Sequence, residues 1–183
     1  MSEHLELMRL TVDLGRAYLE MVDEFEGAGE GYPYNNIPLA REDIAAFVRE
    51  LQEEEQGIGL PPGIVPQTTY VLVRDSRTIV GEIRFRPATA PPFGVGHDHI
   101  GYNVRPSDRR QGYAGVMLSR VLENARALEL HGVSLTVEGE NPPSVRIIER
   151  AGGQVIEETT DPETGERVRL YWIVLSFPVG RTI

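Results

Sequence analysis

Between residues 100 and 130 the apolar pattern of this chain changes its period from two residues to about four. Ile100, Tyr102 and Val104 alternate with small or polar residues, as in a half-buried strand. From Gly112 to Leu130 the apolar residues recur at helical spacing and predict one long helix with a single buried stripe. The polar segment 105–111 joins the two, so the sequence predicts a strand, a short loop and a helix in direct succession.

Further strands and helices precede and follow this unit. Gly132 is expected to end the long helix, and Asn141 is expected to cap a short one. We expect the chain to form one domain over residues 1–183, of the α/β (α+β) class. The other expected elements are a strand at 5–10, helices at 11–26 and about 40–55, a hairpin of strands 70–74 and 79–86, a strand at 133–137, and a hairpin of strands 154–158 and 168–175.

Composition excludes several kinds of catalyst. The 183 residues include no cysteine, and every one of the 18 basic residues is arginine. Thiolate metal sites, a cysteine nucleophile and Schiff-base chemistry are therefore impossible. No serine-hydrolase elbow and no H-E-x-x-H pair is present. His97, Asp98 and His99 stand together, but we expect no metal site there.

The net charge of −10 is concentrated near the N-terminus, where residues 1–60 hold 14 acidic residues and four arginines. Nucleic acid is not an expected partner, because its phosphates require a basic surface. The acidic part could attract a cationic acceptor or simply keep the protein soluble. No apolar stretch reaches membrane length, and the N-terminus shows no signal pattern, so we expect no membrane partner and a cytoplasmic location.

Segment 105–115, R-P-S-D-R-R-Q-G-Y-A-G, is the most informative for function. It contains the predicted helix start, which offers unpaired N–H groups and the positive end of the helix dipole. Gly112 and Ala114 would let a ligand approach the backbone, while Arg105, Arg109 and Arg110 add positive charge. These residues alone allow either a phosphate site or a plain helix start with solvated arginines.

Residues 109–114, R-R-Q-G-Y-A, resemble the Q/R-x-x-G-x-G/A signature of the GNAT acetyltransferase superfamily. Arg109, Gly112 and Ala114 hold its defining positions. The I-G-Y-N-V strand before the signature and the N-P-P-S-V-R-I-I-E-R-A-G-G segment after it also resemble family elements. The resemblance covers nearly the whole chain and implies the GNAT acyl-CoA N-acyltransferase fold. That fold is a mixed, mostly antiparallel central sheet of about seven strands flanked by about four helices.

The resemblance also implies an activity, namely transfer of an acetyl group from the co-substrate acetyl-CoA to a primary amine by direct attack in a ternary complex. It places the pantetheine arm between the strands that end at Val104 and Val137, and the pyrophosphate on the helix start. Asn141 has a second explanation, namely a helix cap without any contact to the cofactor. The implied cofactor residues are Asn103, Val104, Arg109, Arg110, Gln111, Gly112, Tyr113, Ala114, Gly115, Asn141 and Ser144.

The catalytic groups are less clearly marked. Many family members carry a tyrosine seven residues after the motif asparagine as the acid for the leaving thiolate, but Ile148 stands there in this chain. Tyr102, Tyr113 or water would have to replace it. His99 is the favoured base, because histidine titrates near neutral pH; the alternative is a structural histidine. The lesser candidates for the base, expected to be solvated strand or loop residues, are Glu82, His97 and Glu138.

Several alternatives stay open. The chain could be a non-catalytic acetyl-CoA-binding sensor or structural module of the same fold. A dinucleotide-binding protein is disfavoured, because the segment before the helix lacks G-x-G-x-x-G. The acceptor, the oligomeric state and whether the acyl group is strictly acetyl are not set by the motifs, although a homodimer is compatible with the family. Segments 27–40, 57–68 and 87–97 are expected to line the acceptor pocket.

Overall fold

The computed structural model describes residues 3–32, 34–91, 98–161 and 164–176. These residues divide into two compact units, which are described separately below. Unit 1 comprises residues 1–86 and 102–118, and unit 2 comprises residues 87–101 and 119–183. No helix within the described ranges is both long enough and apolar enough to cross a membrane.

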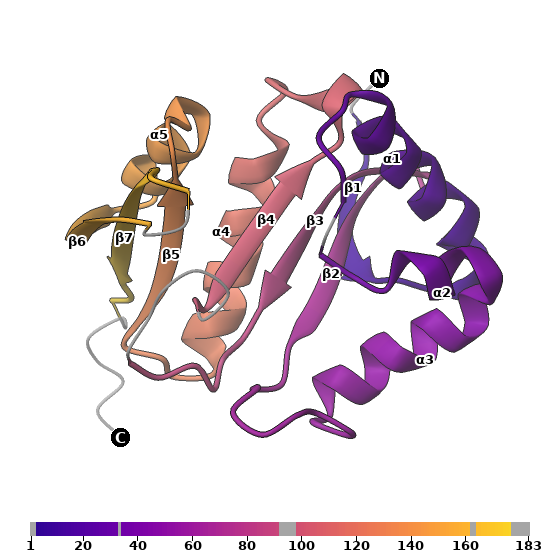
Figure 1. The fold of residues 1–183 in the computed structure, drawn as a ribbon, viewed down its shortest axis with the longest axis horizontal. Helices are drawn as coiled ribbons and strands as arrows, with labels where there is room; N and C mark the ends of the chain where they lie inside the picture. Colours follow the sequence, from indigo (N-terminus) through magenta and orange to yellow (C-terminus); the bar gives the residue numbers. More distant parts are fainter. Residues whose placement is uncertain (1–2, 33, 92–97, 162–163, 177–183) are drawn as a thin grey trace. The chain divides into compact units, whose positions relative to one another are not determined.

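The sheet of unit 1 has the strand order β1-β2-β3-β4 (Figure 1). Its strands are β1 (Leu5–Arg9), β2 (Thr68–Arg74), β3 (Thr78–Phe85) and β4 (Ile100–Val104). The strand β2 pairs antiparallel with both β1 and β3. Asp75 and Ser76 have φ of 51° and 63° in the turn between β2 and β3. Two successive left-handed residues match the twist of the flanking strands, and they produce the tight hairpin that the sequence predicts.

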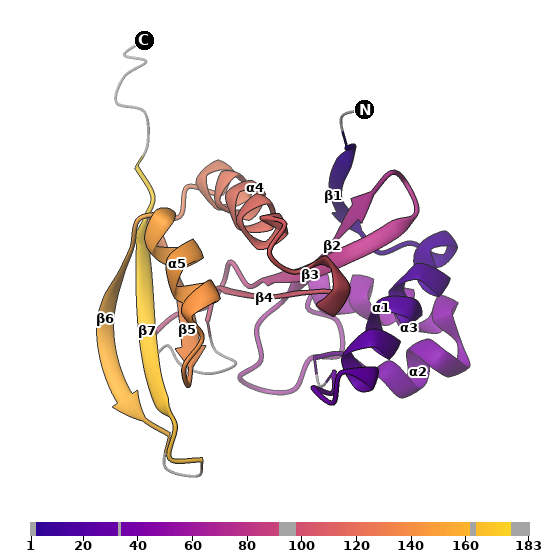
Figure 2. The ribbon, with the colours of Figure 1, turned by 90° about the horizontal axis from the view of Figure 1, so that it is seen from above.

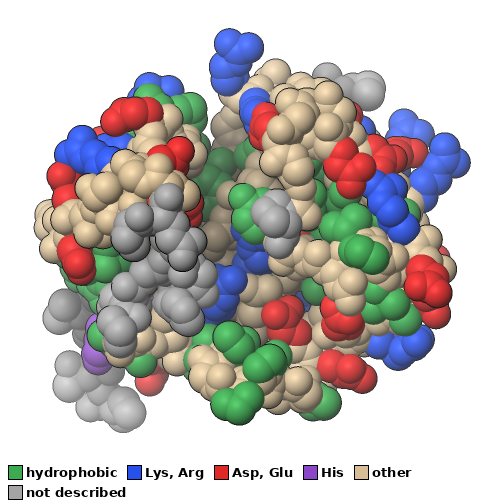
Figure 3. All heavy atoms as spheres, in the orientation of Figure 1, with side chains coloured by type: hydrophobic (Ala, Val, Ile, Leu, Met, Phe, Trp, Pro, Cys, Tyr) green, Lys and Arg blue, Asp and Glu red, His purple; other side chains and the backbone are tan. Residues whose placement is uncertain are grey.

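Three helices cover one face of this sheet (Figure 2). They are α1 (Gly15–Gly27), which follows the 3-10 turn η1 (Val12–Leu14), α2 (Ile37–Glu42) and α3 (Ile44–Glu55). The single helix expected at about 40–55 was wrong, because the chain breaks at Asp43. This residue has extended backbone (φ −146°) and its carboxylate accepts the N–H of Ala46, so it caps α3 instead of continuing α2. Acidic and arginine side chains are interspersed over these helices (Figure 3).

Consecutive residues of β3 face opposite sides of the sheet of unit 1. Glu82 points toward α1, where it meets Tyr18. Gly81 faces the other way, toward Met117 of α4 (Tyr113–Ala127). A β-carbon at Gly81 would lie 2.7 Å from the carbonyl oxygen of Asn103 and 2.8 Å from Cε of Met117. The glycine therefore permits a close approach of β3 to both β4 and α4.

The end of α4 differs from the sequence expectation. The helix ends at Ala127, and Glu129 takes the left-handed conformation (φ 59°) while the N–H of Leu130 bonds to the carbonyl of Ala125. Gly132 is not the stop; it is the first residue of β5 (Gly132–Glu138). A β-carbon at Gly132 would lie 2.4 Å from the indole ring of Trp172, so close packing rather than chain reversal explains this glycine.

Unit 2 contains a second antiparallel sheet with the order β5-β7-β6. Its other strands are β6 (Gly153–Thr160) and β7 (Arg167–Val174), and α5 (Pro142–Arg150) packs on β5 and β6. The expected terminal hairpin is confirmed, with β7 as the central strand. The α/β class is confirmed as well, but the seven described strands form two sheets rather than the single central sheet that we expected.

Candidate functional site

The backbone between β4 and α4 forms a narrow turn in unit 1. After the 3-10 turn η2 (Pro106–Asp108), Arg109 is extended, and Arg110 and Gly112 adopt left-handed φ angles of 64° and 89°. The helix α4 then begins at Tyr113. The N–H groups of a first helical turn have no intrahelical partner, and the helix dipole places partial positive charge there. The turn thus presents donors suited to an anion.

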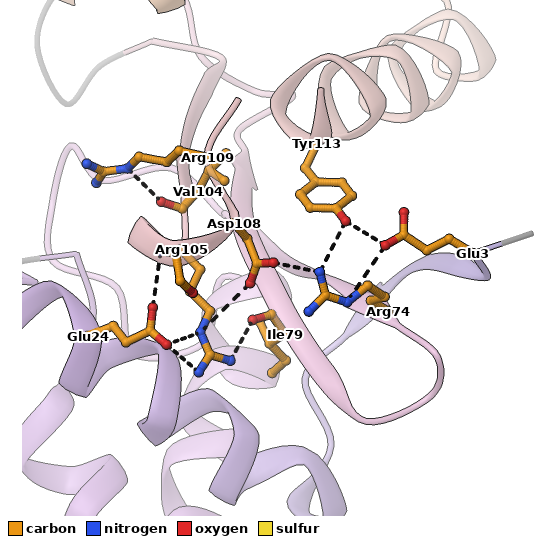
Figure 4. Close-up of polar contacts among 10 residues, drawn as sticks. Glu3, Glu24, Arg74, Ile79, Val104, Arg105, Asp108, Arg109 and Tyr113 are labelled. Atoms are coloured by element: carbon orange, nitrogen blue, oxygen red, sulfur yellow. Dashed lines mark hydrogen bonds and ion pairs between the residues drawn. The ribbon is translucent and has the colours of Figure 1, made fainter. Parts of the chain in front are cut away.

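A network of charged side chains and one tyrosine holds both ends of this turn in place (Figure 4). Arg74 on β2 donates from Nη1 to a carboxylate oxygen of Asp108 (2.6 Å) and to the hydroxyl of Tyr113 (3.2 Å). The Tyr113 hydroxyl in turn donates to Glu3 (2.6 Å). Asp108 is buried, and Arg74 is its partner at the end of η2. The network therefore joins both ends of the turn, η2 and the start of α4, to the same strand.

Two of the three arginines in segment 105–115 are already neutralised. Arg105 pairs with Glu24 of α1 (2.6 Å), and Arg109 makes a bidentate pair with Glu30 (2.7 and 2.5 Å). These arginines hold the pKa values of Glu24 and Glu30 below the ordinary value. The Nε of Arg109 also donates to the carbonyl of Val104 (3.3 Å). Arg110 is exposed and forms no ion pair with any residue in the described ranges, so it is the arginine best able to meet an anion.

Two glycines, Gly112 just before α4 and Gly115 in its first turn, place no side chain on this part of the surface. Gly112 is explained by its φ of 89°, which β-branched and bulky residues avoid. Gly115 lies inside α4, where glycine is less favourable than alanine by about 1 kcal/mol. A β-carbon at Gly115 would meet no described atom within 4 Å, so no contact within the part of the chain that the structure describes requires the glycine. It keeps the surface of the first helical turn open.

The strand β4 contributes the residues that precede the turn. Asn103 is half-buried, and its side-chain amide donates to the hydroxyl of Tyr32 (3.3 Å). Tyr102 is half-buried too, with a shielded hydroxyl oxygen. The backbone N–H of Arg105 bonds to the carbonyl of Val80 on β3 (2.9 Å). The residues that the sequence predicts for the site, 102–104 and 109–115, thus lie along one stretch of unit 1, from the end of β4 to the start of α4.

His99 belongs to unit 2, where it is buried against β5. Its Nδ1 lies 2.9 Å from Oγ of Ser134 and accepts the backbone N–H of Ser134 (3.2 Å), and the Ser134 Oγ accepts the backbone N–H of His99 (3.2 Å). An Nδ1 that accepts an N–H carries no proton, so the neutral ring holds its proton on Nε2. Burial lowers the pKa of His99 from 6.5 to about 4. The catalytic role of His99 stays a prediction, and these contacts favour a structural role.

The pH dependence of stability should report on this buried imidazole. The pKa of His99 is lower in the folded state than in the unfolded state. The stability that the neutral imidazole contributes is therefore complete above pH 6.5 and is lost as the pH falls from 6.5 to 4. At about 1.4 kcal/mol per pKa unit, the loss is up to about 3 kcal/mol. Urea unfolding of the parent and of His99→Gln across this range should show the difference between them shrinking toward low pH.

That comparison isolates His99 because the other shifted groups titrate alike in both proteins. The raised pKa values of Glu54 and Glu82 act in the opposite direction to His99, and the lowered pKa values of Glu24 and Glu30 act in the same direction. We expect the turnover of His99→Gln to stay within about tenfold of the parent. A loss of about 10²–10⁴-fold, typical of a general acid or base, would instead make His99 the base. A pH-independent difference in stability would contradict the buried neutral imidazole.

A buried polar cluster inside unit 1 was not predicted. Glu82 was expected to be solvated, which was wrong, because its side chain is fully buried. Its Oε2 accepts hydrogen bonds from the hydroxyl of Tyr18 (3.0 Å) and from Nδ2 of Asn35 (2.9 Å), and Arg84 lies 3.4 Å from Oε1. Burial raises the pKa of Glu82, against the opposing effect of Arg84. The sequence feature that could have indicated this cluster is a pair of charged residues, two positions apart, in a strand that is otherwise mostly apolar.

A cavity of about 490 Å³ opens beside this cluster, also within unit 1. Its wall combines residues 34–36, residues 50, 51, 53 and 54 of α3, and residues 58–60. Two of the three segments expected to line an acceptor pocket, 27–40 and 57–68, therefore contribute. Most of the third, 92–97, lies outside the described residues, as does the lesser candidate His97. No cluster of three metal-ligating side chains occurs in the portion of the chain that is described.

Comparison with known proteins identifies the family. The model of the acetyltransferase (GNAT) domain matches residues 4–154, which is most of the chain. The chain belongs to the GNAT acetyltransferase family. No curated protein sequence matches it. The GNAT match includes the complete turn between β4 and α4, and it reaches across residues of both units.

Solved GNAT structures agree with the fold. RimJ of Mycobacterium smegmatis, in complex with CoA-disulfide, is 18% identical with a TM-score of 0.69, covering 93% of this chain and 81% of that one. The Salmonella typhimurium acetyltransferase that modifies the N-terminal serine of ribosomal protein L7/L12 is 15% identical with a TM-score of 0.66, covering 94% and 95%. A Vibrio cholerae spermidine N-acetyltransferase SpeG chimera is 16% identical with a TM-score of 0.65, covering 93% and 95%. At these identities the likeness shows the fold alone.

The remaining GNAT motif residues lie in unit 2. Asn141 caps α5 by accepting the N–H of Ser144 (3.2 Å), so its capping role is confirmed. Its contact with a cofactor, and that of Ser144, stay predictions. Ile148, at the position of the frequent tyrosine, is buried, and its side chain lies where a β-carbon at Gly153 would be. It is a core residue of this unit. Glu138, at the end of β5, is exposed, as expected.

Proposed function

We propose that this chain is an acetyl-CoA-dependent N-acetyltransferase, a single domain of residues 1–183 that acetylates a primary amine. The observation that carries the proposal is the start of α4, where N–H groups, a helix dipole and two glycines coincide with the family signature. A pyrophosphate needs close approach to backbone donors, and the open surface at Gly115 supplies it. The exposed Arg110 adds a positive charge beside the turn.

The proposed roles of the other cofactor residues follow from their positions. The N–H groups from residue 110 to residue 115, including those of Gln111 and Ala114, would bind the pyrophosphate, while backbone groups of Asn103 and Val104 would bind the pantetheine arm. Arg109 would act through position rather than charge, because Glu30 neutralises it and its Nε bonds to the Val104 carbonyl. Its substitution should therefore loosen the turn as well as remove a guanidinium group.

The proposed chemistry needs little from acid or base groups. The acceptor nitrogen attacks the thioester carbonyl, a C–N bond forms, the C–S bond breaks, and the proton lost by nitrogen balances the one that the thiolate gains. An amine that is already neutral can attack directly, so the protein would mainly supply position. Tyr102, which lies on β4 next to Asn103 and Val104, is the proposed proton donor to the thiolate.

The cavity of unit 1 is the proposed acceptor pocket. Its mixture of an exposed aromatic ring, amides, carboxylates and apolar side chains suits an amine-bearing molecule. Among the structural neighbours, SpeG is a spermidine N-acetyltransferase and the Salmonella enzyme acts on an N-terminal serine. We therefore propose spermidine, a serine-initiated peptide, a free amino acid and an aminoglycoside as the first acceptors to test, with thiol release as the readout.

Acetyl-CoA should raise the melting temperature of the protein. A ligand at 100 times its Kd stabilises the native state by about 2.7 kcal/mol, and for a chain of this size that corresponds to roughly 5–10 °C. S-acetylpantetheine, which lacks the nucleotide and the pyrophosphate, should shift the melting temperature far less. Differential scanning fluorimetry with both compounds measures this.

The two readouts separate the alternatives. No shift at millimolar acetyl-CoA would overturn the proposed function. A clear shift without thiol release from any acceptor would instead favour a non-catalytic acetyl-CoA-binding module, for which the buried Ile148 in place of a tyrosine is the supporting observation.

A further inference from the structure

Two opposite charges are buried side by side on β3. Glu82 is fully buried and Arg84 is 5% exposed, and they form an ion pair on one face of the strand. Removing two charges from water opposes folding by several kcal/mol per ion, and apolar residues of similar size are often as stable or more stable. Stability therefore does not explain why this strand carries the pair.

Each member of the pair holds one residue of the loop between α1 and α2. Glu82 accepts from Nδ2 of Asn35 (2.9 Å), and the Arg84 guanidinium lies 3.9 Å from the ring centroid of Tyr34. Charges two positions apart on one strand thus contact consecutive loop residues. Tyr18 reinforces the first contact, because its hydroxyl donates to Glu82 and accepts from Asn35 (2.7 Å).

The held residues form part of the cavity wall. Tyr34, Asn35 and Asn36 all line it, and Tyr34 is 48% exposed. Asn36 donates to Glu50 of α3, which also lines the cavity (3.1 Å), and caps α2. The position of this wall therefore depends on Glu82 and Arg84, although the carboxylate of Glu82 is itself closed off from the cavity.

We propose that Glu82 and Arg84 are positioning residues, which hold Tyr34 and Asn35 in the wall of the cavity and thereby set the affinity for the amine acceptor. This inference rests on the proposed function, with the cavity as the acceptor pocket. It assigns the pair no contact with the acceptor and no proton transfer. Acceptor affinity should change with the pair, and binding of acetyl-CoA at the start of α4 should not.

The test replaces the whole pair, because removing one charge would leave the other buried and unpaired. The double variant Glu82→Leu/Arg84→Met leaves no charge unpaired, and Asn35 can still donate to the hydroxyl of Tyr18, although that hydroxyl loses Glu82 as its acceptor. The protein should therefore still fold, with a melting temperature close to the parent's. Asn35→Ala, which leaves both charges in place, is the second variant. The matched control is Glu158→Gln/Arg167→Gln, an exposed ion pair between β6 and β7.

Three measurements are compared: the acetyl-CoA Kd by calorimetry, kcat and KM for spermidine or a serine-initiated peptide, and amide hydrogen exchange of residues 34–36. Both test variants should raise the acceptor KM at least tenfold, with kcat within about threefold and the acetyl-CoA Kd within twofold. Exchange at 34–36 should quicken. The control should change none of these quantities.

The outcomes are distinguishable. Unchanged exchange at residues 34–36 would overturn the positioning role, whether or not either acceptor is acetylated. Faster exchange with an unchanged KM would overturn the link to acceptor affinity. A parent protein that neither binds acetyl-CoA nor releases thiol would refute the proposed function, and with it the link to an acceptor, while the exchange result would still decide whether the pair holds the loop.

Discussion

Gly115→Leu should weaken acetyl-CoA binding at least about 100-fold, a loss of about 2.7 kcal/mol, while leaving the protein at least as stable as the parent. Glycine inside a helix is less stable than leucine by up to about 1 kcal/mol, and a β-carbon at residue 115 meets no described atom within 4 Å. The leucine side chain would fill the surface on which the pyrophosphate is proposed to lie. Calorimetric titration and thermal melting measure the two effects, which should move in opposite directions.

Gly27→Leu is the matched control for this experiment. Gly27 is the last residue of α1, and a β-carbon there also meets no described atom within 4 Å. This variant should bind acetyl-CoA like the parent. Gly115→Leu with an affinity within threefold of the parent would move the pyrophosphate away from the start of α4. A loss of affinity together with a loss of stability would point to distortion of the helix rather than to a blocked surface.

Local signals explain why much of the fold could be predicted. The change of period between Val104 and Gly112 is a property of adjacent residues, and the strand, turn and helix lie where it indicates. The Asn141 cap and the turn at Asp75 and Ser76 likewise depend on side-chain chemistry within a few residues. The break at Asp43 had a local signal too, a capping residue, but the apolar spacing continues across it and concealed the boundary.

The position of the candidate site could be predicted from the sequence, but the ion pairing of its arginines could not. The segment 105–115 was identified from its own residues. The partners that neutralise Arg105 and Arg109 lie 81 and 79 positions away in the sequence, so no local pattern could show that these charges are already paired. The same limit applies to His99, whose pKa is set by burial against Ser134, 35 positions away. Long-range burial changes which charged groups can meet a ligand.

Gly81→Val should lower the free energy of unfolding by at least about 3 kcal/mol, at the upper end of what overpacking usually costs. For a chain of this size the melting temperature should fall by roughly 6–12 °C. The reason is the backbone: the nearest atom to the added β-carbon would be the carbonyl oxygen of Asn103, at 2.7 Å. A strand cannot move one carbonyl aside as a side chain changes rotamer, so β3 and β4 would have to separate locally.

A double-mutant cycle with Met117→Ala separates the two close contacts of Gly81. Met117 is flexible, and its Cε and Sδ lie 2.8 and 3.2 Å from the added β-carbon, so shortening it should recover only part of the loss. Full recovery would show that β4 gives way and that the helix alone sets the constraint. Because Asn103 and Val104 lie on the strand that would shift, acetyl-CoA affinity should fall in Gly81→Val and stay low in the double variant. An affinity equal to that of the parent, together with reduced stability, would separate the packing of β4 from the binding of the co-substrate.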